Sequence, residues 1–537
     1  MTVPDHLFIR ADASTRIGTG HVMRMIALAQ AYQDRGGPVT MACATCPESV
    51  AQRVCHEEIA CERLENCEPG SQTDWQHTIA RAKSLGARWV VLDGYHFDLT
   101  YQRALREAGL RVLAVDDYGH CETWAADAVL NQNIFAPELK YQSEVEGCQF
   151  LLGTRFALLR REFRQAAGSH RFEAPDESCR RRREESHSVC VERDQSLLAS
   201  APTVQETPRP IHRLLVTLGG ADPDNVTGRL LSTLNLLAEF RLEIKALVGG
   251  GNPHLEYLRQ LTAASPHSIE VLHHVLDMPA LYRWADGIIS AGGSTCWEWL
   301  FYRLPAAVVC IADNQRPVIA GLVKHQLAMD LGWHENLDPT FVSAKLRGWL
   351  KCAGKHRPKP PANLAVDALG ADRVATVLDG THVWLRRASA GDAQLWFQWA
   401  NDPAVRANGF HPDPVTWEVH QKWFEHHRLS PDSRLWIGFD ILDKPMGYVR
   451  LHRRDNAAWE IGVAVDAAAR NRGMGLRLVK LALQQFAREN ESATILARIK
   501  PANAASLKLF RAAGFADDST RANPDCCVLV CKLINII

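Results

Sequence analysis

The stretch IGTGHVMR, residues 17–24, places two glycines just before a histidine and an arginine. Gly18 and Gly20 permit a tight turn and the close approach of a ligand. His21 then falls in the first turn of a helix, with Arg24 on the same face one turn later. Because the free N–H groups and positive dipole end of a helix start disfavour an imidazolium, we expect a neutral His21 that can act as a general base. A histidine that only caps its own helix would give the same pattern.

Two more glycine loops follow strand-like runs later in the chain. The stretch SAGGSTCWE opens a helix, so its amides and hydroxyls could bind a diphosphate; these groups belong to Gly292, Gly293, Ser294 and Thr295. Glu298, one turn into the helix, could accept hydrogen bonds from two ribose hydroxyls. The stretch LGGADPDN contributes a second loop, with Gly219 and Gly220. Two such loops indicate a nucleotide-sugar site, and ordinary strand-to-helix turns are the alternative.

A further glycine turn, RNRGMG, lies between a strand and a helix near the carboxyl end. Consecutive amides at a helix start can hold a pyrophosphate. The candidate residues to bind it are Arg470, Arg472, Gly473, Met474 and Gly475. The strand AWEIGVAVD carries Glu460, a candidate to remove a proton from an amine directly or through water. An exposed strand glutamate without a catalytic role is the alternative.

The elements that must position these residues alternate between strands and helices in the first two thirds of the chain. Apolar runs such as ARWVVLDG and LRVLAVDD end in acidic and glycine residues. This is the pattern of a parallel sheet with helices outside and ligand loops at its carboxyl edge. It occurs twice, which predicts two Rossmann-like lobes with a cleft between them. From about residue 383, helices come first and strands follow, which predicts a separate α+β domain.

A polar stretch and a proline-rich joint divide the chain. We expect a first lobe over residues 1–165, a polar insertion over 166–208, a second lobe over 209–375 and an α+β domain over 383–537. The insertion contains the run Arg180 to Arg183, which could bind a polyanion but is more typical of a solvated run because two glutamates follow it. The joint CAGKHRPKPPANL should carry few packed contacts.

Composition and charge restrict the function. The 537 residues include 61 Lys+Arg and 61 Asp+Glu, a balance that argues against nucleic acid or an anionic membrane as the main partner. The first residues lack the basic start and apolar run of a signal peptide, and we expect no bilayer span. The 15 cysteines, an odd number, favour reduced thiols in the cytoplasm. No cluster of metal ligands is evident, so we expect no metal, and the sequence does not indicate an oligomeric state.

Four motifs together resemble one enzyme family. RADASTRIGTGHVMRMIALA, LGGADPDN, ADGIISAGGSTCWE and IADNQ occur in the order typical of the UDP-sugar hydrolases of pseudaminic acid biosynthesis, which have the two-Rossmann glycosyltransferase-B architecture. The resemblance implies that UDP-2,4-diacetamido-2,4,6-trideoxy-β-L-altropyranose is cleaved to the free sugar and UDP by inverting attack of water. It implies that His21 is the base, that Asn314 lies on the sugar side, and that Glu298 with the Gly292–Thr295 turn lies on the UDP side. Asp12 and Arg24 match motif positions whose individual roles stay open.

The α+β segment resembles the GCN5-related N-acetyltransferases. The R-x-x-G-x-G spacing from Arg470, followed by NAASLKLFRAAGF from Asn503, occurs in the order of that family's acetyl-CoA loop and its next strand and helix. The resemblance implies acetyl-CoA as co-substrate, bound by the loop and by Asn503. Many members carry a tyrosine at the position of Phe510, where it protonates the departing thiolate; in this chain that hydroxyl is missing.

The two resemblances predict a bifunctional enzyme that acetylates a 4-amino UDP-sugar and then removes UDP from the product. Three alternatives stay open. The acetyltransferase could act on another amine, such as another amino sugar or a protein N-terminus. The first half could transfer its sugar to an acceptor other than water. The chain could also be a non-catalytic UDP-sugar sensor.

Overall fold

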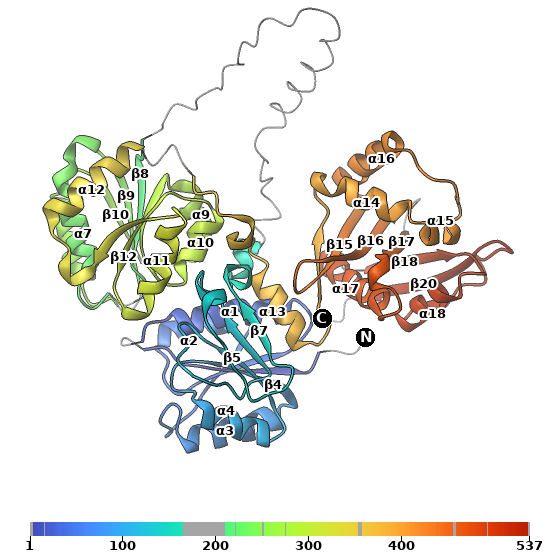
Figure 1. Ribbon diagram of the computed structural model, residues 1–537, viewed down its shortest axis with the longest axis horizontal. Helices are drawn as coiled ribbons and strands as arrows, with labels where there is room; N and C mark the ends of the chain where they lie inside the picture. Colours follow the sequence, from blue (N-terminus) through green and yellow to red (C-terminus); the bar gives the residue numbers. More distant parts are fainter. Residues whose placement is uncertain are drawn as a thin grey trace, which may run out of the picture.

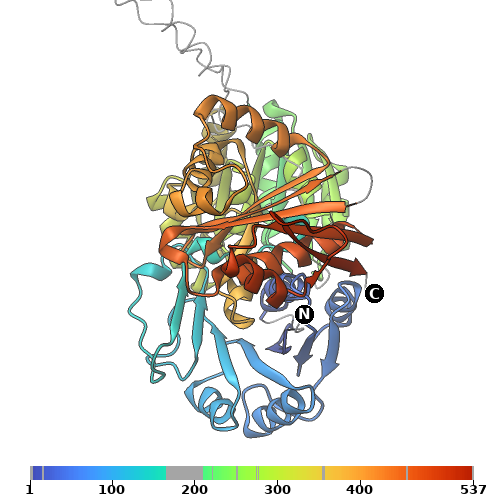
Figure 2. The same cartoon turned by 90° about the vertical axis from the view of Figure 1, so that its right-hand side faces the viewer.

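The chain forms three units, each built on its own β-sheet. The computed structural model describes residues 4–14, 17–164, 210–220, 222–249, 252–273, 275, 277–352, 357–454, 458–490 and 492–534. Two lobes lie one against the other, and the third unit lies to one side of them (Figures 1 and 2). The expected insertion at 166–208, with its arginine run, lies outside the described residues.

The first lobe has a seven-stranded parallel sheet in the order β3-β2-β1-β4-β5-β6-β7. Its strands are β1 (His6–Ala11), β2 (Val39–Cys43), β3 (Ala60–Arg63), β4 (Ala87–Asp93), β5 (Arg111–Val115), β6 (Ala128–Asn131) and β7 (Gln149–Leu152). Apolar side chains of α1 (Gly20–Gln33) and α2 (Glu48–His56) cover one face, and those of α3 (Gln72–Ser84) and α4 (Leu99–Glu107) cover the other. The central strands are apolar throughout because both faces are covered.

The second lobe has a six-stranded parallel sheet in the order β10-β9-β8-β11-β12-β13. Its strands are β8 (Arg213–Thr217), β9 (Glu243–Val248), β10 (Ser268–His273), β11 (Gly287–Ala291), β12 (Ala306–Cys310) and β13 (Met329–Trp333). One face is covered by α7 (Val226–Leu234), α8 (Leu255–Ala263) and α12 (Pro339–Cys352). The other is covered by α9 (Met278–Trp284), α10 (Thr295–Phe301) and α11 (Arg316–Lys324).

In both lobes the strand order reverses between two central strands, β1 and β4 in the first lobe and β8 and β11 in the second. Loops that follow the strands on either side of such a reversal open a ligand crevice at the carboxyl edge of the sheet. The glycine turn before α1 follows β1, and the loops with Gly219 and Gly292 follow β8 and β11. The predicted pair of Rossmann-like lobes is confirmed.

The chain returns to the first lobe before it enters the third unit. Helix α13 (Gly370–Leu378) packs beside α1 (Figure 1). Its apolar side chains belong to the core of the first lobe: Ala371, Val374, Ala375, Val377 and Leu378. The boundary expected at residue 375 therefore falls inside a helix that packs on the first lobe.

The third unit has a mixed seven-stranded sheet in the order β14-β15-β16-β17-β18-β20-β19. Its strands are β14 (Val383–Arg387), β15 (Ser433–Asp440), β16 (Pro445–Arg453), β17 (Ala458–Val465), β18 (Ser492–Ile499), β19 (Ala516–Asp517) and β20 (Cys527–Ile534). Helices α14 (Ala393–Ala400) and α16 (Trp417–Leu429) cover one face, and α17 (Met474–Glu489) and α18 (Ala504–Ala512) cover the other (Figure 1). The short α15 (Pro403–Asn408) lies between α14 and α16 in the chain.

Strand β14 precedes the first helix of this unit, so the expectation that helices come first was wrong. The five residues VWLRR are too few and too charged to give a strand signal on their own, and they form a strand because they pair with β15. Short 3₁₀ helices complete the described structure: Ala136–Glu138, Thr154–Phe156, Asn235–Phe240, Asp313–Gln315, His334–Asn336, Ala362–Leu364, Ala390–Asp392 and Ala467–Ala469. Among the helices described, none is both long enough and apolar enough to cross a bilayer.

Polar contacts join the third unit to the first lobe. Asp443, in the turn between β15 and β16, accepts hydrogen bonds from Arg155 and from Arg373, each at 2.7 Å. Arg35, in the turn after α1, donates to the hydroxyl of Thr381 at 2.6 Å and to the carbonyl of Val383 at 3.3 Å. These contacts fix the start of the third unit against the first lobe.

Candidate active sites

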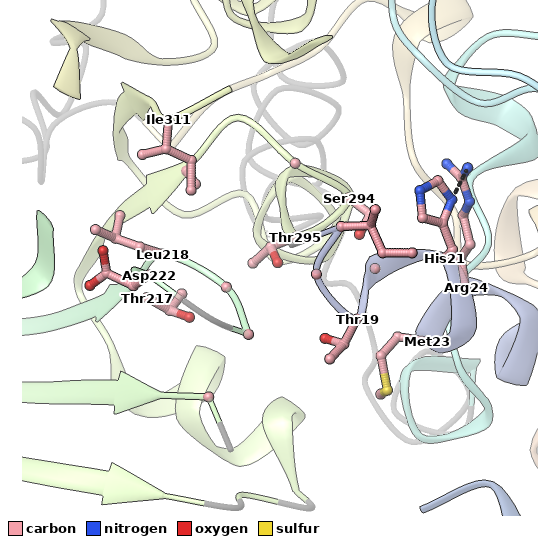
Figure 3. A pocket seen from close by; sticks show the side chains of 18 of the residues that line it. Thr19, His21, Met23, Arg24, Thr217, Leu218, Asp222, Ser294, Thr295 and Ile311 are labelled. Carbon is pink, nitrogen blue, oxygen red and sulfur yellow. Dashed lines mark hydrogen bonds between the residues drawn. The ribbon is translucent and has the colours of Figure 1, made fainter. Parts of the chain in front are cut away.

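A cleft of about 800 Å³ lies between the two lobes. Its walls contain predicted residues of both lobes: Gly20, His21, Arg24, Gly219, Gly220, Gly292, Gly293, Ser294, Thr295, Glu298 and Asn314. Figure 3 shows His21 and Arg24 at the start of α1, near the second-lobe loop that carries Ser294 and Thr295. The fold thus brings together residues that separate sequence motifs predicted.

His21 is held by a buried carboxylate. Its Nδ1 lies 2.7 Å from Oδ1 of Asp93, the last residue of β4. Arg24 donates to both oxygens of Asp93, from Nε at 2.7 Å and from Nη2 at 2.6 Å. Nδ1 of His21 also lies 3.1 Å from Nη2 of Arg24, which can only donate, but its contact with the carboxylate of Asp93, which can only accept, is shorter. In the neutral imidazole, the proton therefore belongs on Nδ1, and Nε2 is the nitrogen with the lone pair.

A second carboxylate balances the charge of Arg24. Asp117 accepts from Nη1 of Arg24 at 2.6 Å and from the hydroxyl of Tyr95 at 2.7 Å. Burial opposes the ionisation of Asp93 and Asp117, but the guanidinium of Arg24 outweighs it, so the pKa of each carboxyl lies below its usual value. Burial would lower the pKa of Arg24 as well, and the two carboxylates instead raise it. All three groups are therefore charged, which fixes the orientation of His21.

A hydrogen bond joins the two lobes beside His21. Nδ2 of Asn314, in the 3₁₀ turn after β12, donates to the hydroxyl of Tyr95 at 2.9 Å. The rings of Tyr95 and His21 are nearly perpendicular, at 81°, with a centroid separation of 5.2 Å. Asn314 therefore approaches the histidine from the opposite lobe.

Asp12 lies behind the glycine turn. It shares a smaller cavity of about 330 Å³ with His21, Asp93 and His96. Its Oδ1 accepts from the backbone N–H groups of Ala44 and Thr45 at 2.7 and 2.8 Å. Its Oδ2 lies 3.2 Å from Nε2 of His96. These contacts tie the end of β1 to the loop after β2, so Asp12 supports the wall of the site.

The two second-lobe loops meet the first lobe closely. A Cβ atom on Gly220 would lie 2.7 Å from Oγ1 of Thr19, so the loop after β8 reaches the glycine turn of the first lobe only with glycine at this position. In the loop after β11, the N–H of Gly292 donates to Oε1 of Gln315 at 3.2 Å. The same oxygen accepts from the N–H of Ile311 at 3.1 Å, which joins this loop to the one after β12.

Glu298 lies in the cleft wall, and its carboxylate already has partners. The hydroxyl of Tyr282 donates to Oε2 at 2.7 Å, and Nη2 of Arg160 lies 3.3 Å from Oε1. Burial raises the pKa of Glu298, and the charge of Arg160 opposes that shift. A ribose bound here would share the carboxylate with these two side chains.

The predicted acetyl-CoA loop leads into α17. Gly473 immediately precedes the helix, and Met474 is buried. A Cβ atom on Gly475 would lie 2.6 Å from Cδ1 of Leu509, so glycine lets α17 approach α18. The backbone amides at this helix start are the groups suited to a pyrophosphate.

The two arginines of this loop differ in their surroundings. Arg470 donates from Nε to the carbonyl of Val465 at 3.0 Å, and its Nη2 lies 2.7 Å from Asp402. Arg472 is exposed. Arg470 therefore braces the loop, and Arg472 is the arginine whose charge faces solvent.

Strands β17 and β18 diverge at Glu460. They are parallel, and their pairing covers Ala458–Glu460 against Thr494–Leu496, whereas β17 continues to Val465. Oε2 of Glu460 lies 3.1 Å from Nε of Arg454. Glu460 thus stands at the point where a parallel sheet opens, on the strand that leads to the acetyl-CoA loop.

The start and the interior of α18 hold the last predicted residues. Asn503 caps the helix, because its Oδ1 accepts from the N–H of Ser506 at 3.0 Å. Phe510 is buried, with its ring 5.1 Å from that of Phe515. The side chain at this position is therefore part of the core of the unit.

Sequence reasoning missed five residues of the interlobe site: Asp93, Tyr95, Asp117, Arg160 and Gln315. A signal existed for the two aspartates, since each ends or follows an apolar run that becomes a strand at the reversal or next to it. Tyr95 and Arg160 carry no comparable signal, whereas Gln315 belongs to the motif IADNQ, of which only Asn314 was predicted. Within the described ranges, no group of three or more His, Cys, Asp and Glu side chains is arranged to hold a metal ion.

Comparisons with known proteins divide the chain in the same way. Residues 382–516 match the acetyltransferase (GNAT) domain family. The chain is 27% identical over 325 residues to the UDP-2,4-diacetamido-2,4,6-trideoxy-beta-L-altropyranose hydrolase of Campylobacter jejuni, an alignment that covers 59% of this chain and 96% of that protein. The crystal structure of MurG from Acinetobacter baumannii aligns with 70% of this chain and 100% of its own, at 16% identity and a TM-score of 0.44.

A further relative spans all three units. The uncharacterized protein MJ1062 of Methanocaldococcus jannaschii is 21% identical over 517 residues, which cover 94% of this chain and 96% of that protein. The order of the units is therefore shared with a second protein. The chain joins a two-lobed unit, homologous to the UDP-sugar hydrolase, to a GNAT acetyltransferase domain.

Proposed function

We propose that this chain catalyses two consecutive steps on one UDP-sugar. The third unit transfers the acetyl group of acetyl-CoA to a 4-amino UDP-sugar. The interlobe cleft then hydrolyses the product, UDP-2,4-diacetamido-2,4,6-trideoxy-β-L-altropyranose, to the free sugar and UDP. The observation that carries the proposal is the imidazole of His21, fixed by Asp93 and placed opposite the glycine loops of the second lobe.

His21 acts as the general base in the hydrolysis. With Nδ1 bonded to Asp93, Nε2 is the nitrogen that takes a proton from water. The water oxygen bonds to the anomeric carbon, and the bond from that carbon to the phosphate oxygen breaks from the opposite side, which gives inversion. The electron pair leaves with UDP, and the ionised Asp93 stabilises the imidazolium that forms.

The second lobe holds the leaving group. The amides and hydroxyls of Gly292–Thr295 and the loop with Gly219 and Gly220 line the cleft where a diphosphate would bind. UDP departs as a stable anion, so the reaction requires positioning more than acid catalysis. Asn314, bonded to Tyr95, is placed to contact the sugar, and Glu298 to contact the ribose.

The third unit performs the acetylation. The amides of Gly473, Met474 and Gly475 bind the pyrophosphate of acetyl-CoA, with Arg472 and Asn503 at the margins of the site. Glu460, where β17 and β18 diverge, takes the amine proton directly or through water. Acetyl transfer then depends on holding the amine against the thioester.

Incubation of the full chain with the 4-amino UDP-sugar and acetyl-CoA tests both steps, with products followed by mass spectrometry. We expect the N-acetylated UDP-sugar to appear first, and the free diacetamido sugar with UDP to follow. The diacetamido UDP-sugar alone should give UDP and free sugar without acetyl-CoA. UDP release that needs an added sugar acceptor would identify a glycosyltransferase, and binding without any turnover would identify a sensor.

A further inference from the structure

One row of polar side chains crosses the sheet of the acetyltransferase unit. Ser433 of β15 lies opposite His452 of β16, and His452 lies opposite Glu460 of β17. Residues directly opposite each other on antiparallel strands point to the same face of the sheet. The three side chains therefore share the face that α14 and α16 cover (Figure 1).

Hydrogen bonds continue this row to α16. Nδ1 of His452 lies 3.1 Å from Oγ of Ser433, and the same oxygen lies 2.8 Å from Nδ1 of His427. The two imidazole centroids are 4.2 Å apart. Trp423 packs against both rings, at centroid distances of 4.8 and 5.7 Å. Ser433 is buried, so the contacts between the two histidines are shielded from water.

The serine hydroxyl can pass a proton between the two rings. It has one proton to donate and lone pairs to accept, and it meets an Nδ1 atom on each side. One histidine therefore carries its proton on Nδ1 and the other on Nε2. When one histidine takes up a proton, the hydrogen bonds on both sides of the serine hydroxyl reverse their direction, and the other histidine can release a proton.

Of the two histidines in this row, His452 is the one that lies opposite Glu460. Its Nε2 is buried and has no hydrogen-bond partner within the described structure. Burial lowers the pKa of His452 to about 3, and the nearby charge of Arg450 acts in the same direction. Burial also lowers the pKa of His427. Both rings are therefore neutral near pH 7, the state in which they conduct a proton without retaining it.

We propose that His452, Ser433 and His427 form a relay that moves the amine proton from Glu460 to the surface at α16. This inference rests on the proposed acetyltransferase function.

The amine nitrogen bonds to the thioester carbonyl carbon, and the carbon–sulfur bond breaks with its electron pair on sulfur. The amine proton passes to Glu460. The side chain of Glu460, which lies across the strand pair from His452, then turns from Arg454 toward this ring and gives the proton to Nε2. The Nδ1 proton of His452 moves to Ser433, the hydroxyl proton moves to Nδ1 of His427, and Nε2 of His427 releases its proton to solvent. The thiolate takes a proton from solvent, so charge and protons balance.

Replacement of Ser433 in the full chain tests the relay, with release of CoA as the assay. Ser433→Ala removes the hydroxyl that joins the two rings, whereas Ser433→Thr keeps it. We expect Ser433→Ala to lower kcat about 10-fold or more while the KM for acetyl-CoA stays unchanged. Ser433→Thr should keep most of the native kcat. In His427→Ala, which removes the surface end, added imidazole should restore part of the lost rate.

The possible results distinguish a failure of the proposed relay from a failure of the proposed acceptor. A native kcat in Ser433→Ala, or an equal loss in Ser433→Ala and Ser433→Thr, would overturn the relay and leave the proposed function intact. If the native chain acetylates another amino sugar, such as glucosamine, but not the 4-amino UDP-sugar, the proposed acceptor fails. The ratio of the variant kcat to the native kcat, measured with that amino sugar, then decides the relay. No turnover of either amine would overturn the relay together with the acetyltransferase activity.

Discussion

The two candidate bases, His21 and Glu460, are held in opposite ways. The side chain of His21 is 10% exposed and bonded to Asp93, which is 0% exposed. The side chain of Glu460 is 20% exposed, and its ion-pair partner Arg454 is 64% exposed. Buried charges leave His21 one orientation, whereas water can compete for the partner of Glu460. The interlobe site should therefore depend on single atoms, and the acetyltransferase site should tolerate more change.

The largest effect should follow His21→Ala. If the buried network makes His21 irreplaceable, UDP release should fall by a factor of about 10²–10⁴, the usual cost of losing a positioned base. Binding of the UDP-sugar and acetyl transfer should stay unchanged, because both depend on other residues. Steady-state assay of UDP with the diacetamido UDP-sugar measures the loss.

His77→Ala is the matched control for this variant, since His77 is exposed on α3. It should hydrolyse at the native rate. Near-native hydrolysis by His21→Ala would refute the assignment of the base and remove the contrast between the two sites.

Asp93→Asn should have the next largest effect. The amide can donate to Nδ1 of His21, which would move the imidazole proton to Nε2, and it leaves the charge of Arg24 short of one partner. We expect UDP release to fall about 10²-fold, and the free energy of unfolding at neutral pH to fall by about 3 kcal/mol, as for other broken buried ion pairs.

The loss of stability should depend on pH in one direction. Because the folded-state pKa of Asp93 is lowered, its contribution is complete above the unfolded pKa of about 3.9 and disappears as the pH falls through the lower folded value. The difference in stability between the native chain and Asp93→Asn should therefore be constant from about pH 5 to 7 and shrink in acid. Denaturant titrations at several pH values measure it, and a difference that grows in acid would contradict the assignment.

His21 was predicted from the sequence as a site residue, whereas Asp93 was not. His21 and the residues of the glycine loops belong to short contiguous motifs, so their types and spacing predicted them before any fold was known. The bonds of Asp93 to His21 and of Asn314 to Tyr95 join segments that only the folded sheets bring together. Asp93 could have been predicted from the sequence, because it ends an apolar run.

The fold, like the site, was predicted where the signal lies in a local sequence pattern and missed where it depends on tertiary packing. Alternating strands and helices predicted both lobes, since each parallel strand is buried on two faces and carries a strong apolar signal. The place of α13 was not predicted, because nothing within GADRVATVL tells on which lobe it packs. Strand β14 was missed because its five residues are too few to give a clear strand pattern, and their pairing with β15 defines the strand.

Separation of the two catalytic parts should have a smaller effect. Residues 1–380 keep α13 in the first-lobe core, and residues 381–537 keep β14 in its sheet. The cut loses the ion pairs of Asp443 with Arg155 and Arg373, worth about 1 kcal/mol or less each where one partner is exposed. Each fragment should keep its own activity and melt a few degrees lower. Fragments that fail to fold would show that the junction is part of a shared core.

Phe510→Tyr should have the smallest effect. It restores the hydroxyl that related acetyltransferases use to protonate the departing thiolate, and a tyrosine ring fits a site already filled by phenylalanine. A thiol with a pKa near the usual 8.5 leaves tolerably well as its anion, so the acid is helpful and not required. The buried position of Phe510 beside Phe515 also gives the new hydroxyl a desolvation cost unless it reaches a partner. We therefore expect clear acetyl transfer by the native chain, and in Phe510→Tyr a gain of no more than a few-fold. Release of CoA with the 4-amino UDP-sugar measures both. An inactive native chain with a robustly active Phe510→Tyr would show that one missing hydroxyl disabled the domain, and that the acetyltransferase site is as intolerant of change as the cleft around His21.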